Sequence, residues 1–334
     1  MTDAPALAAS VVISVKNRAV LMWDCLSGLA RQSIGRDRFE VVLIDNVSTE
    51  DLRAVATRAE AELGLTIRYD RMREDHGPAP ARNHGVSLAT APIIAFTDSD
   101  CRPDPDWLAR GLAAFDTPMV AFCTGPVLPK PEGKVRVTSK LSFVTRDEHP
   151  TFPTANAFYR RDLFTRFGGF DISLSYRDPL DRATECADTD LAWRLIEAGF
   201  DRRFVPAAIM YHELENQGVL LWILEPTRLF VLPALVRRHP ILRKKLLTAR
   251  YFFYPASWLL YVAAVIVGAA VMTWTWLLAL LPVLLLAQGI ARTRSANPRV
   301  LLCFAGRVLL HLPRMLTMTI SLLYGSARFR CLVL

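Results

Sequence analysis

Acidic residues are nearly missing from the last third of the chain. Residues 219–334 contain one acid, Glu225, beside 14 lysines and arginines, whereas residues 1–218 contain 31 acids and 26 basic residues. These net charges of +13 and −5 make up the total of +8. Because the positive charge is confined to a strongly apolar segment, it is typical of a membrane segment and its flanks. We therefore expect no nucleic-acid partner.

Several motifs are missing as well. No Gly-x-Gly-x-x-Gly follows the first apolar run, which argues against a dinucleotide-dependent dehydrogenase, and the lack of Gly-x-x-x-x-Gly-Lys-Ser/Thr excludes a P-loop kinase or ATPase. A composition of 52% hydrophobic and 22% charged residues excludes a disordered, collagen-like or disulfide-scaffold protein. Met1–Ser10 lacks the basic start of a secretory signal peptide.

The cysteines show no short spacing typical of a disulfide framework or a metal site. We expect buried, reduced thiols in a cytosolic compartment. The six residues are Cys25, Cys101, Cys123, Cys186, Cys303 and Cys331.

Charge is absent from residues 251–291, a stretch of 41 residues. A helix of that length would reach about 60 Å, twice the ~30 Å hydrocarbon core of a bilayer. We therefore predict a transmembrane hairpin, with spans near Phe252–Met272 and Trp274–Ala291 and with Trp274 and Trp276 at the interfacial bend. The alternative is the buried helical core of a soluble domain.

Basic residues flank this hairpin, from Arg237 to Arg250 before it and from Arg292 to Arg299 after it, whereas the turn Thr273–Thr275 carries no charge. By the positive-inside rule, both outer ends face the cytoplasm. The predicted localisation is the inner (cytoplasmic) membrane, with a multi-pass anchor. The predicted domains are a cytoplasmic catalytic domain (1–218), a basic interfacial segment (219–250), the hairpin (251–291) and an amphipathic interfacial helix with a cytoplasmic tail (292–334).

Two further segments have the pattern of helices at a membrane surface. Val219–Val236 combines large apolar residues with a basic end, and we predict that it skims the membrane. In residues 301–324, Arg307, His311 and Arg314 recur at helical spacing and predict one cationic face. This pattern favours a helix lying along the surface, and a spanning helix is the alternative.

Strand patterns alternate with helical patterns between residues 11 and 115. Such alternation implies right-handed crossovers and an α/β fold with a mainly parallel sheet. The predicted strands are Val11–Val15, Val41–Ile44, Thr66–Tyr69 and Ile93–Thr97, and the predicted helices are Ala19–Gln32, Glu50–Leu63, Pro80–Ala89 and Asp106–Phe115.

Acidic side chains follow two of these strands, at Asp45 and at Asp98 and Asp100. Ligands of such sheets bind beyond the carboxyl ends of the strands. The sequence therefore predicts that a nucleotide and a divalent ion bind at this edge. Oxygen ligands at a partly solvated site favour Mg²⁺ or Mn²⁺.

Seven segments together resemble glycosyltransferase family 2, whose members have the GT-A fold. They extend over residues 11–212, and their order and spacing carry the resemblance. The segments are VVISVKNR, VVLIDNVSTED, GPAPARNHG, IIAFTDSDCRPDPDWL, TANAFYRRDLFTRFGGFD, ADTDLAWRLIEAGF and YHE.

The resemblance implies an inverting transfer from a nucleotide-sugar. For the donor it implies that Asp45 binds the base, that Arg82 positions the base or the diphosphate, and that Asp98 contacts the ribose. It also implies that Asp100 holds the Mg²⁺ or Mn²⁺ that bridges the diphosphate, with Asp98 in the same metal motif. His212 is a candidate third metal ligand or diphosphate contact, with a structural role as the alternative.

For the acceptor, the resemblance implies that Asp188 is the general base. Asp188 lies in the first turn of a predicted helix, where the helix dipole would lower its pKa and burial would raise it. Asn156, Trp193 and Arg194 are candidate acceptor-binding residues, with turn or packing roles as alternatives. Ala187 stands where many relatives have an acid, and Glu185 is a candidate substitute.

The sequence lacks Gln-x-x-Arg-Trp, the mark of processive synthases in this superfamily. We therefore predict a non-processive hexosyltransferase, which transfers one sugar from a UDP- or dTDP-sugar to a membrane lipid or lipid-linked acceptor in cell-envelope glycan or glycolipid synthesis. The alternatives are a nucleotidyltransferase and a catalytically inactive scaffold of the same fold.

Overall fold

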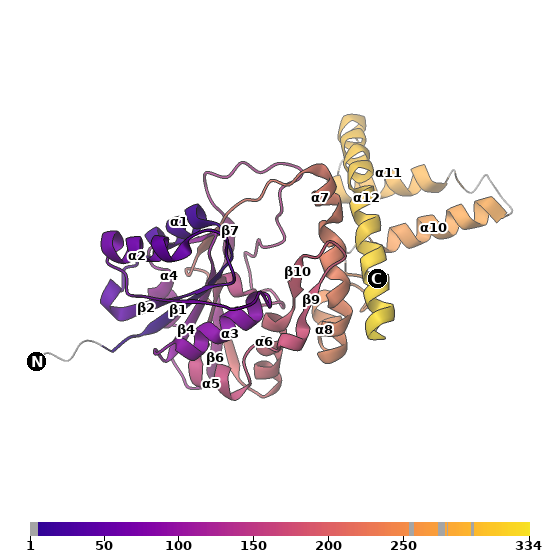
Figure 1. Cartoon of the computed structure of the whole chain (residues 1–334). Helices are drawn as coiled ribbons and strands as arrows, with labels where there is room; N and C mark the ends of the chain where they lie inside the picture. The colour runs from indigo at the N-terminus through magenta and orange to yellow at the C-terminus, as the bar shows by residue number, and fades with distance from the viewer. Residues whose placement is uncertain (1–5, 254–256, 273–277, 279, 295–296) are drawn as a thin grey trace, which may run out of the picture. The chain divides into compact units, whose positions relative to one another are not determined.

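The chain divides into two compact units, Met1–Gln217 and Gly218–Leu334. The computed structural model describes residues 6–253, 257–272, 278, 280–294 and 297–334. Figure 1 labels the helices and strands of both units.

A seven-stranded sheet forms the centre of the first unit. Its strands are β1 (Ala9–Val15), β2 (Phe39–Asp45), β3 (Ile67–Arg71), β4 (Ile93–Asp98), β6 (Val120–Thr124), β8 (Ala157–Arg160) and β11 (Asp201–Phe204). The strand order is β11-β6-β8-β4-β1-β2-β3. The pairs β4–β1, β1–β2, β2–β3 and β11–β6 are parallel, which confirms the predicted mainly parallel sheet. The exception, β8, is antiparallel to β4 and β6.

Helices cover both faces of this sheet (Figure 1). They are α1 (Ala19–Leu29), α2 (Leu52–Leu63), α3 (Pro78–Leu88), α4 (Trp107–Leu112), α5 (Arg161–Arg166) and α6 (Ala187–Glu197). Val11 and Ile13 face α1, α2 and α4 in one hydrophobic cluster. Val12 faces α3, where a Cβ at Gly85 would lie only 2.5 Å from Val12 Cγ1. Because both faces are covered, β1 and β2 are buried along almost their whole length.

Short elements complete the first unit. β5 (Cys101–Pro103), β12 (Met210–His212) and β7 (Val127–Pro129) form a three-stranded sheet, and β9 (Ser175–Arg177) pairs with β10 (Ala183–Glu185). Three 3₁₀ turns occur at η1 (Arg36–Arg38), η2 (Thr154–Asn156) and η3 (Ile172–Leu174). β5 directly follows β4 and β10 directly precedes α6, so both small sheets border the ends of elements that carry predicted site residues.

Local sequence explains where the second helix begins and ends. Asp51 Oδ1 accepts a hydrogen bond of 3.0 Å from the Ala54 amide at the start of α2, as an N-cap aspartate does. Gly64 ends the helix with a φ of 63°, a left-handed conformation that glycine adopts without steric cost.

The second unit is helical. Its elements are α7 (Val219–Leu224), η4 (Glu225–Val231), α8 (Leu232–Arg238), α9 (Leu242–Leu246), α10 (Ser257–Met272), α11 (Leu280–Thr293) and α12 (Pro298–Phe329). Within the described residues, the continuous helical run Val219–Arg238 is the one helix long and apolar enough to cross a membrane.

Two apolar helices lie in the described parts of the predicted hairpin. In the described parts of the two predicted spans, α10 has 16 residues and α11 has 14, whereas a crossing needs about 20. The predicted turn Thr273–Thr275, together with Trp274 and Trp276, lies outside the described residues. A multi-pass arrangement is therefore not supported, and the candidate spanning helix is the segment that the sequence predicted to skim the surface.

The polar face of α12 packs against other helices of the second unit. Arg314, a member of the predicted cationic face, forms an ion pair with Glu225 at 2.6 Å and donates to the Trp222 carbonyl. The His311 ring lies 4.9 Å from the Trp222 ring, between centroids. The described polar side chains of this face therefore pack against α7 and η4, because the one acid of the unit is there. The side chain of Arg307 is not among those that the structure describes.

Candidate active site

Asp45 and Asp98 lie at the same edge of the sheet, on either side of β1. In the register of the sheet, Asp45 is opposite Val15 and Asp98 is opposite Ser14. The edge that the sequence predicted from strand ends is therefore formed by these two aspartates.

Asp45 is fully buried, and protein groups already bind its carboxylate. Its Oδ1 accepts from the Ser48 amide at 2.7 Å, and its Oδ2 accepts from the Tyr69 hydroxyl at 2.8 Å and from Arg71 Nη1 at 3.1 Å. These contacts join the loop after β2 to β3. In this structure the carboxylate of Asp45, predicted to bind the base, is therefore occupied by donors from the protein itself.

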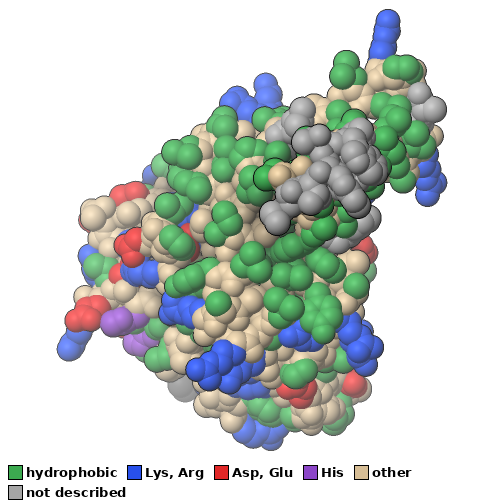
Figure 2. All heavy atoms as spheres, turned by 90° about the vertical axis from the view of Figure 1, so that its right-hand side faces the viewer, with side chains coloured by type: hydrophobic (Ala, Val, Ile, Leu, Met, Phe, Trp, Pro, Cys, Tyr) green, Lys and Arg blue, Asp and Glu red, His purple; other side chains and the backbone are tan. Residues whose placement is uncertain are grey.

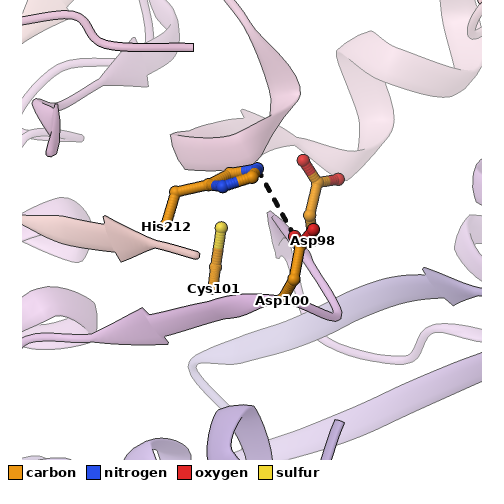
Figure 3. Close-up of side chains that lie close together, drawn as sticks. All are labelled: Asp98, Asp100, Cys101 and His212. Atoms are coloured by element: carbon orange, nitrogen blue, oxygen red, sulfur yellow. Dashed lines mark ion pairs between the residues drawn. The ribbon is translucent and has the colours of Figure 1, made fainter. Parts of the chain in front are cut away.

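Four potential ligands gather beyond the end of β4. One ligand atom from each of Asp98, Asp100, Cys101 and His212 lies within 4.8 Å of the others, and Figure 3 shows the four side chains converging. β12 brings His212 there, because it pairs antiparallel with β5 and sets His212 opposite Cys101. The Glu213 amide also donates to the Asp100 carbonyl at 3.0 Å.

Two observations test whether these side chains fit a divalent cation. Asp100 Oδ1 is buried and has no hydrogen-bond partner within the described part of the chain, so an oxygen with ligand character is free. His212 Nδ1 lies 2.7 Å from the Glu213 carbonyl, which can only accept. In the neutral ring Nε2 therefore carries the lone pair, 3.4 Å from Asp100 Oδ1. The donor set fits a bound metal.

The fourth member, Cys101, differs in its chemistry. Burial and then the charges of Asp98 and Asp100 raise the pKa of its thiol well above the usual range. A protonated thiol is a poor ligand, and Mg²⁺ and Mn²⁺ prefer oxygen. We therefore assign the candidate ligand set to Asp98, Asp100 and His212.

A buried guanidinium links this edge to the loop before α6. Arg82 donates to Asp98 Oδ1 at 2.8 Å and to Glu185 Oε1 at 2.7 Å. Burial favours protonation of Asp98, but the charges of Arg82 and His212 outweigh it and lower the pKa of Asp98. Arg82 also interacts electrostatically with Asp188. The same guanidinium therefore interacts with Asp98, at the candidate metal site, and with Asp188, the predicted base.

Asp188 lies in the first turn of α6, and its Oδ1 accepts from the Thr189 amide at 2.7 Å. Burial, followed by the charge of Glu185, raises the pKa of Asp188 to about 7, although the Thr189 amide and Arg82 oppose the change. The structure thus answers a question that the sequence left open, since burial outweighs the helix terminus. A carboxylate of this pKa suits general base catalysis near neutral pH.

The three predicted acceptor residues are held by protein contacts. Asn156 is buried, accepts from Trp107 Nε1 at 2.8 Å, and donates to the carbonyls of Pro126 and Ala208 at 2.9 and 2.7 Å. Both hydrogens of its amide are thus used, which accords with the structural alternative.

Trp193 and Arg194 anchor α6, the helix that carries Asp188. Trp193 Nε1 donates to the Pro150 carbonyl at 2.9 Å. Arg194 binds Asp190 at 2.8 Å and donates to the carbonyls of Phe167 and Gly169. These contacts fix α6 against the neighbouring loops.

Sequence reasoning missed Arg18, whose Nη1 pairs with Asp100 Oδ2. Asn17 and Arg18 have positive φ angles of 58° and 67°, and so does Val47 with 61°. Such strained backbone is typical of functional sites. Glu50 holds the turn, since its carboxylate accepts from the amides of Arg18 and Ala19 at 3.1 and 2.7 Å. No pattern in the sequence indicated these angles.

Solved structures define the class of this fold. A mannosyltransferase from Pyrobaculum calidifontis, solved with GDP-Man and Mn²⁺, matches 96% of this chain and 86% of its own with a TM-score of 0.60 and 20% identity. TarS from S. aureus, solved with UDP, matches 96% of this chain and 91% of its own with a TM-score of 0.50 and 15% identity. The first unit has the GT-A fold.

Residues 10–172 match the family model described as Glycosyl transferase family 2, and this part of the chain belongs to glycosyltransferase family 2, as the resemblance predicted. A pre-mycofactocin glycosyltransferase of Mycobacterium tuberculosis is 30% identical over 62% of this chain. Glycosyltransferase AglE of Haloferax volcanii is 26% identical over 64% of this chain and 69% of its own length. The chain spans 43% of the mycobacterial relative.

Proposed function

We propose that this chain is an inverting, metal-dependent glycosyltransferase. It transfers a single hexose from a UDP- or dTDP-sugar to a membrane lipid or lipid-linked acceptor, in the synthesis of cell-envelope glycans or glycolipids. One observation carries the proposal. Arg82 forms ion pairs with both Asp98 and Glu185, and it also interacts electrostatically with Asp188. This arrangement supports one cleft with a donor side and an acceptor side.

On the donor side, Asp98, Asp100 and His212 would hold Mg²⁺ or Mn²⁺. When bound, the cation compensates the charge that develops on the departing nucleoside diphosphate. Asp45 orders the wall beside the base, and Arg82 holds Asp98 in its ionised form. Arg18 lies beside Asp100 and, released from it, can pair with a diphosphate oxygen.

On the acceptor side, Asp188 takes the proton of the acceptor hydroxyl. The acceptor oxygen forms a bond to C1 of the sugar while the bond from C1 to the diphosphate breaks, and the proton passes to Asp188. Inversion requires one base on the face opposite the leaving group. A pKa of about 7 leaves Asp188 mostly ionised in slightly alkaline solution.

Transfer of one hexose at each encounter is supported by two observations. The sequence lacks Gln-x-x-Arg-Trp. A relative in Streptomyces hygroscopicus, 38% identical over 132 residues, is a validoxylamine A glucosyltransferase, and its name supports a hexose donor.

A membrane-associated acceptor is supported by the surface of the second unit. Several large apolar side chains in the middle of α12 point outward, with Leu310 and Leu316 each 48% exposed and Ile320 66% exposed. The basic cluster from Arg237 to Lys245 lies in the same unit, and Figure 2 shows hydrophobic (green) and basic (blue) side chains on the face that it draws. We propose that this unit binds anionic lipids of the cytoplasmic leaflet.

The test of the reaction uses membranes that contain the protein. Release of nucleoside diphosphate is measured for a panel of UDP-, dTDP- and GDP-sugars, with and without Mn²⁺. Metal-dependent release supports the proposal. Release of pyrophosphate would instead indicate a nucleotidyltransferase, and nucleotide binding without turnover would indicate an inactive scaffold.

The test of membrane binding uses sedimentation with phosphatidylcholine vesicles, with and without phosphatidylglycerol. Ile320→Asp on α12 should weaken binding to both vesicle types. The matched control is Ile172→Asp, since Ile172 is 60% exposed but belongs to the first unit. Equal binding by both variants would refute the role of α12.

A further inference from the structure

Lys130 is a buried cation that the proposed mechanism does not use. It is 4% exposed, and its Nζ contacts carboxylates from two distant parts of the chain. One is Asp24 Oδ2 in α1 at 2.7 Å, and the other is Glu213 Oε2 after β12 at 3.0 Å. Both carboxylates remain partly exposed, so the ammonium is the member that loses its hydration.

Burial of a charge in this way contributes little to stability. The desolvation of an ammonium offsets much of its attraction to the carboxylates, and well-packed apolar side chains at such positions often stabilise a protein as well or better. The position of Lys130 beside the candidate ligands therefore points to a role in their geometry.

Contacts of Lys130 reach the strand that carries His212. The Lys130 amide donates to the His212 carbonyl at 3.0 Å, while its ammonium holds the next residue, Glu213. The Glu213 amide in turn donates to the Asp100 carbonyl at 3.0 Å. The main chain and the side chain of Lys130 thus fix the end of β12.

Contacts of α1 reach the other part of the same site. Asp24, held by Lys130, precedes Cys25, whose thiol donates to the Asp98 carbonyl at 3.7 Å. The Lys130 ammonium therefore links two parts of the candidate metal site. It contacts Glu213 next to His212, and through Asp24 it contacts the helix α1, which binds the turn that carries Asp98 and Asp100.

We propose that Lys130 is a positioning residue that sets the separation of His212 from Asp98 and Asp100, and thereby the affinity for the divalent cation. This inference rests on the proposed metal dependence. Residues that orient metal ligands typically change metal affinity by 10–100-fold when they are replaced.

The test measures binding of Mn²⁺ alone to the full chain, by electron paramagnetic resonance of the free ion. Lys130→Gln should weaken binding about tenfold, and Lys130→Arg should restore much of it. The sign is diagnostic. Through-space electrostatics alone would make Lys130→Gln bind Mn²⁺ more tightly, since a positive charge is removed from the neighbourhood of a cation site.

Lys140→Gln is the matched control, because Lys140 pairs with Glu215 at 3.7 Å, two residues beyond Glu213. It should leave Mn²⁺ affinity unchanged. Asp24→Asn removes the α1 side of the bridge and should weaken binding, and the effects of Asp24→Asn and Lys130→Gln should not add in the double variant. Thermal unfolding checks that each variant is folded.

The outcomes separate this inference from the proposed function. If the wild-type chain binds no Mn²⁺, the proposed metal dependence fails. If the wild type binds Mn²⁺ and folded Lys130→Gln binds it as tightly or more tightly, the positioning role is overturned. Equal weakening by Lys130→Gln and Lys140→Gln also overturns it.

Discussion

Replacement of Asp188 by asparagine should abolish turnover and at the same time stabilise the protein. Burial and the charge of Glu185 raise the pKa of Asp188 from its ordinary 3.8 to about 7. This change corresponds to about 4 kcal/mol of unfavourable free energy for the ionised form. The folded protein thus disfavours ionisation of the carboxylate that the reaction needs as its base.

The sign follows from the two pKa values. Well below pH 3.8, Asp188 is protonated in the folded and the unfolded chain, and the wild type loses no stability through this group. As the pH rises towards 7, the unfolded chain ionises this group freely, so the folded state loses up to about 4 kcal/mol relative to it. Asparagine resembles the protonated side chain at every pH, and its oxygen can still accept from the Thr189 amide.

The assay follows thermal unfolding from pH 4 to pH 8. The Tm of Asp188→Asn should differ little from that of the wild type at pH 4 and exceed it increasingly up to about pH 7. Asp162→Asn is the matched control, because Asp162 also lies in a first helical turn, that of α5, but is exposed. Its Tm difference from the wild type should stay small at every pH.

Activity provides the second readout. A base with a pKa of about 7 is ionised in roughly one molecule in ten at pH 6, so wild-type turnover should fall about tenfold from its alkaline plateau. Asp188→Asn should bind the nucleotide-sugar and release no nucleoside diphosphate. Turnover at the wild-type rate, or a Tm difference independent of pH, would refute the reasoning.

Three further changes probe the same site. Asp100→Ala should abolish the Mn²⁺ dependence of donor binding, measured by nucleotide titration with and without the metal, and an unchanged metal titration would contradict the assignment. Arg18→Gln frees Asp100 Oδ2 and should tighten binding of Mn²⁺ alone several-fold by Coulomb attraction, opposite in sign to Lys130→Gln; weaker binding would show that Arg18 does not compete with the metal. Glu185→Gln removes a negative charge near Asp188 and should move the acidic limb of the pH–rate profile to lower pH, and a shift to higher pH would contradict the electrostatic account.

Alternation of apolar strands with amphipathic helices predicted the sheet well, because each pattern depends on residues a few positions apart. The almost fully buried β1 and β2 were recognisable as apolar runs. The aspartates at their edge followed from the direction of the strands. The strand β8 was not predicted, and its direction is set by its antiparallel pairing with β4 and β6, which a pattern within one strand does not show.

Orientation was harder to predict than position. The spacing of His311 and Arg314 correctly indicated a polar face on α12, but it could not show which way that face turns. Glu225 decides it, because the single acid of the unit draws Arg314 inwards and leaves the apolar side outermost.

The order of motifs along the chain determined the family, the sheet and the carboxylates at its edge. The fold alone placed His212 beside Asp100 through the pairing of β5 with β12, joined Asp24 to Glu213 through Lys130, and set the pKa of Asp188. The reason is physical: helical and strand patterns depend on neighbouring residues, whereas ligand geometry and proton affinity depend on burial and charge contributed by segments that are distant in the sequence.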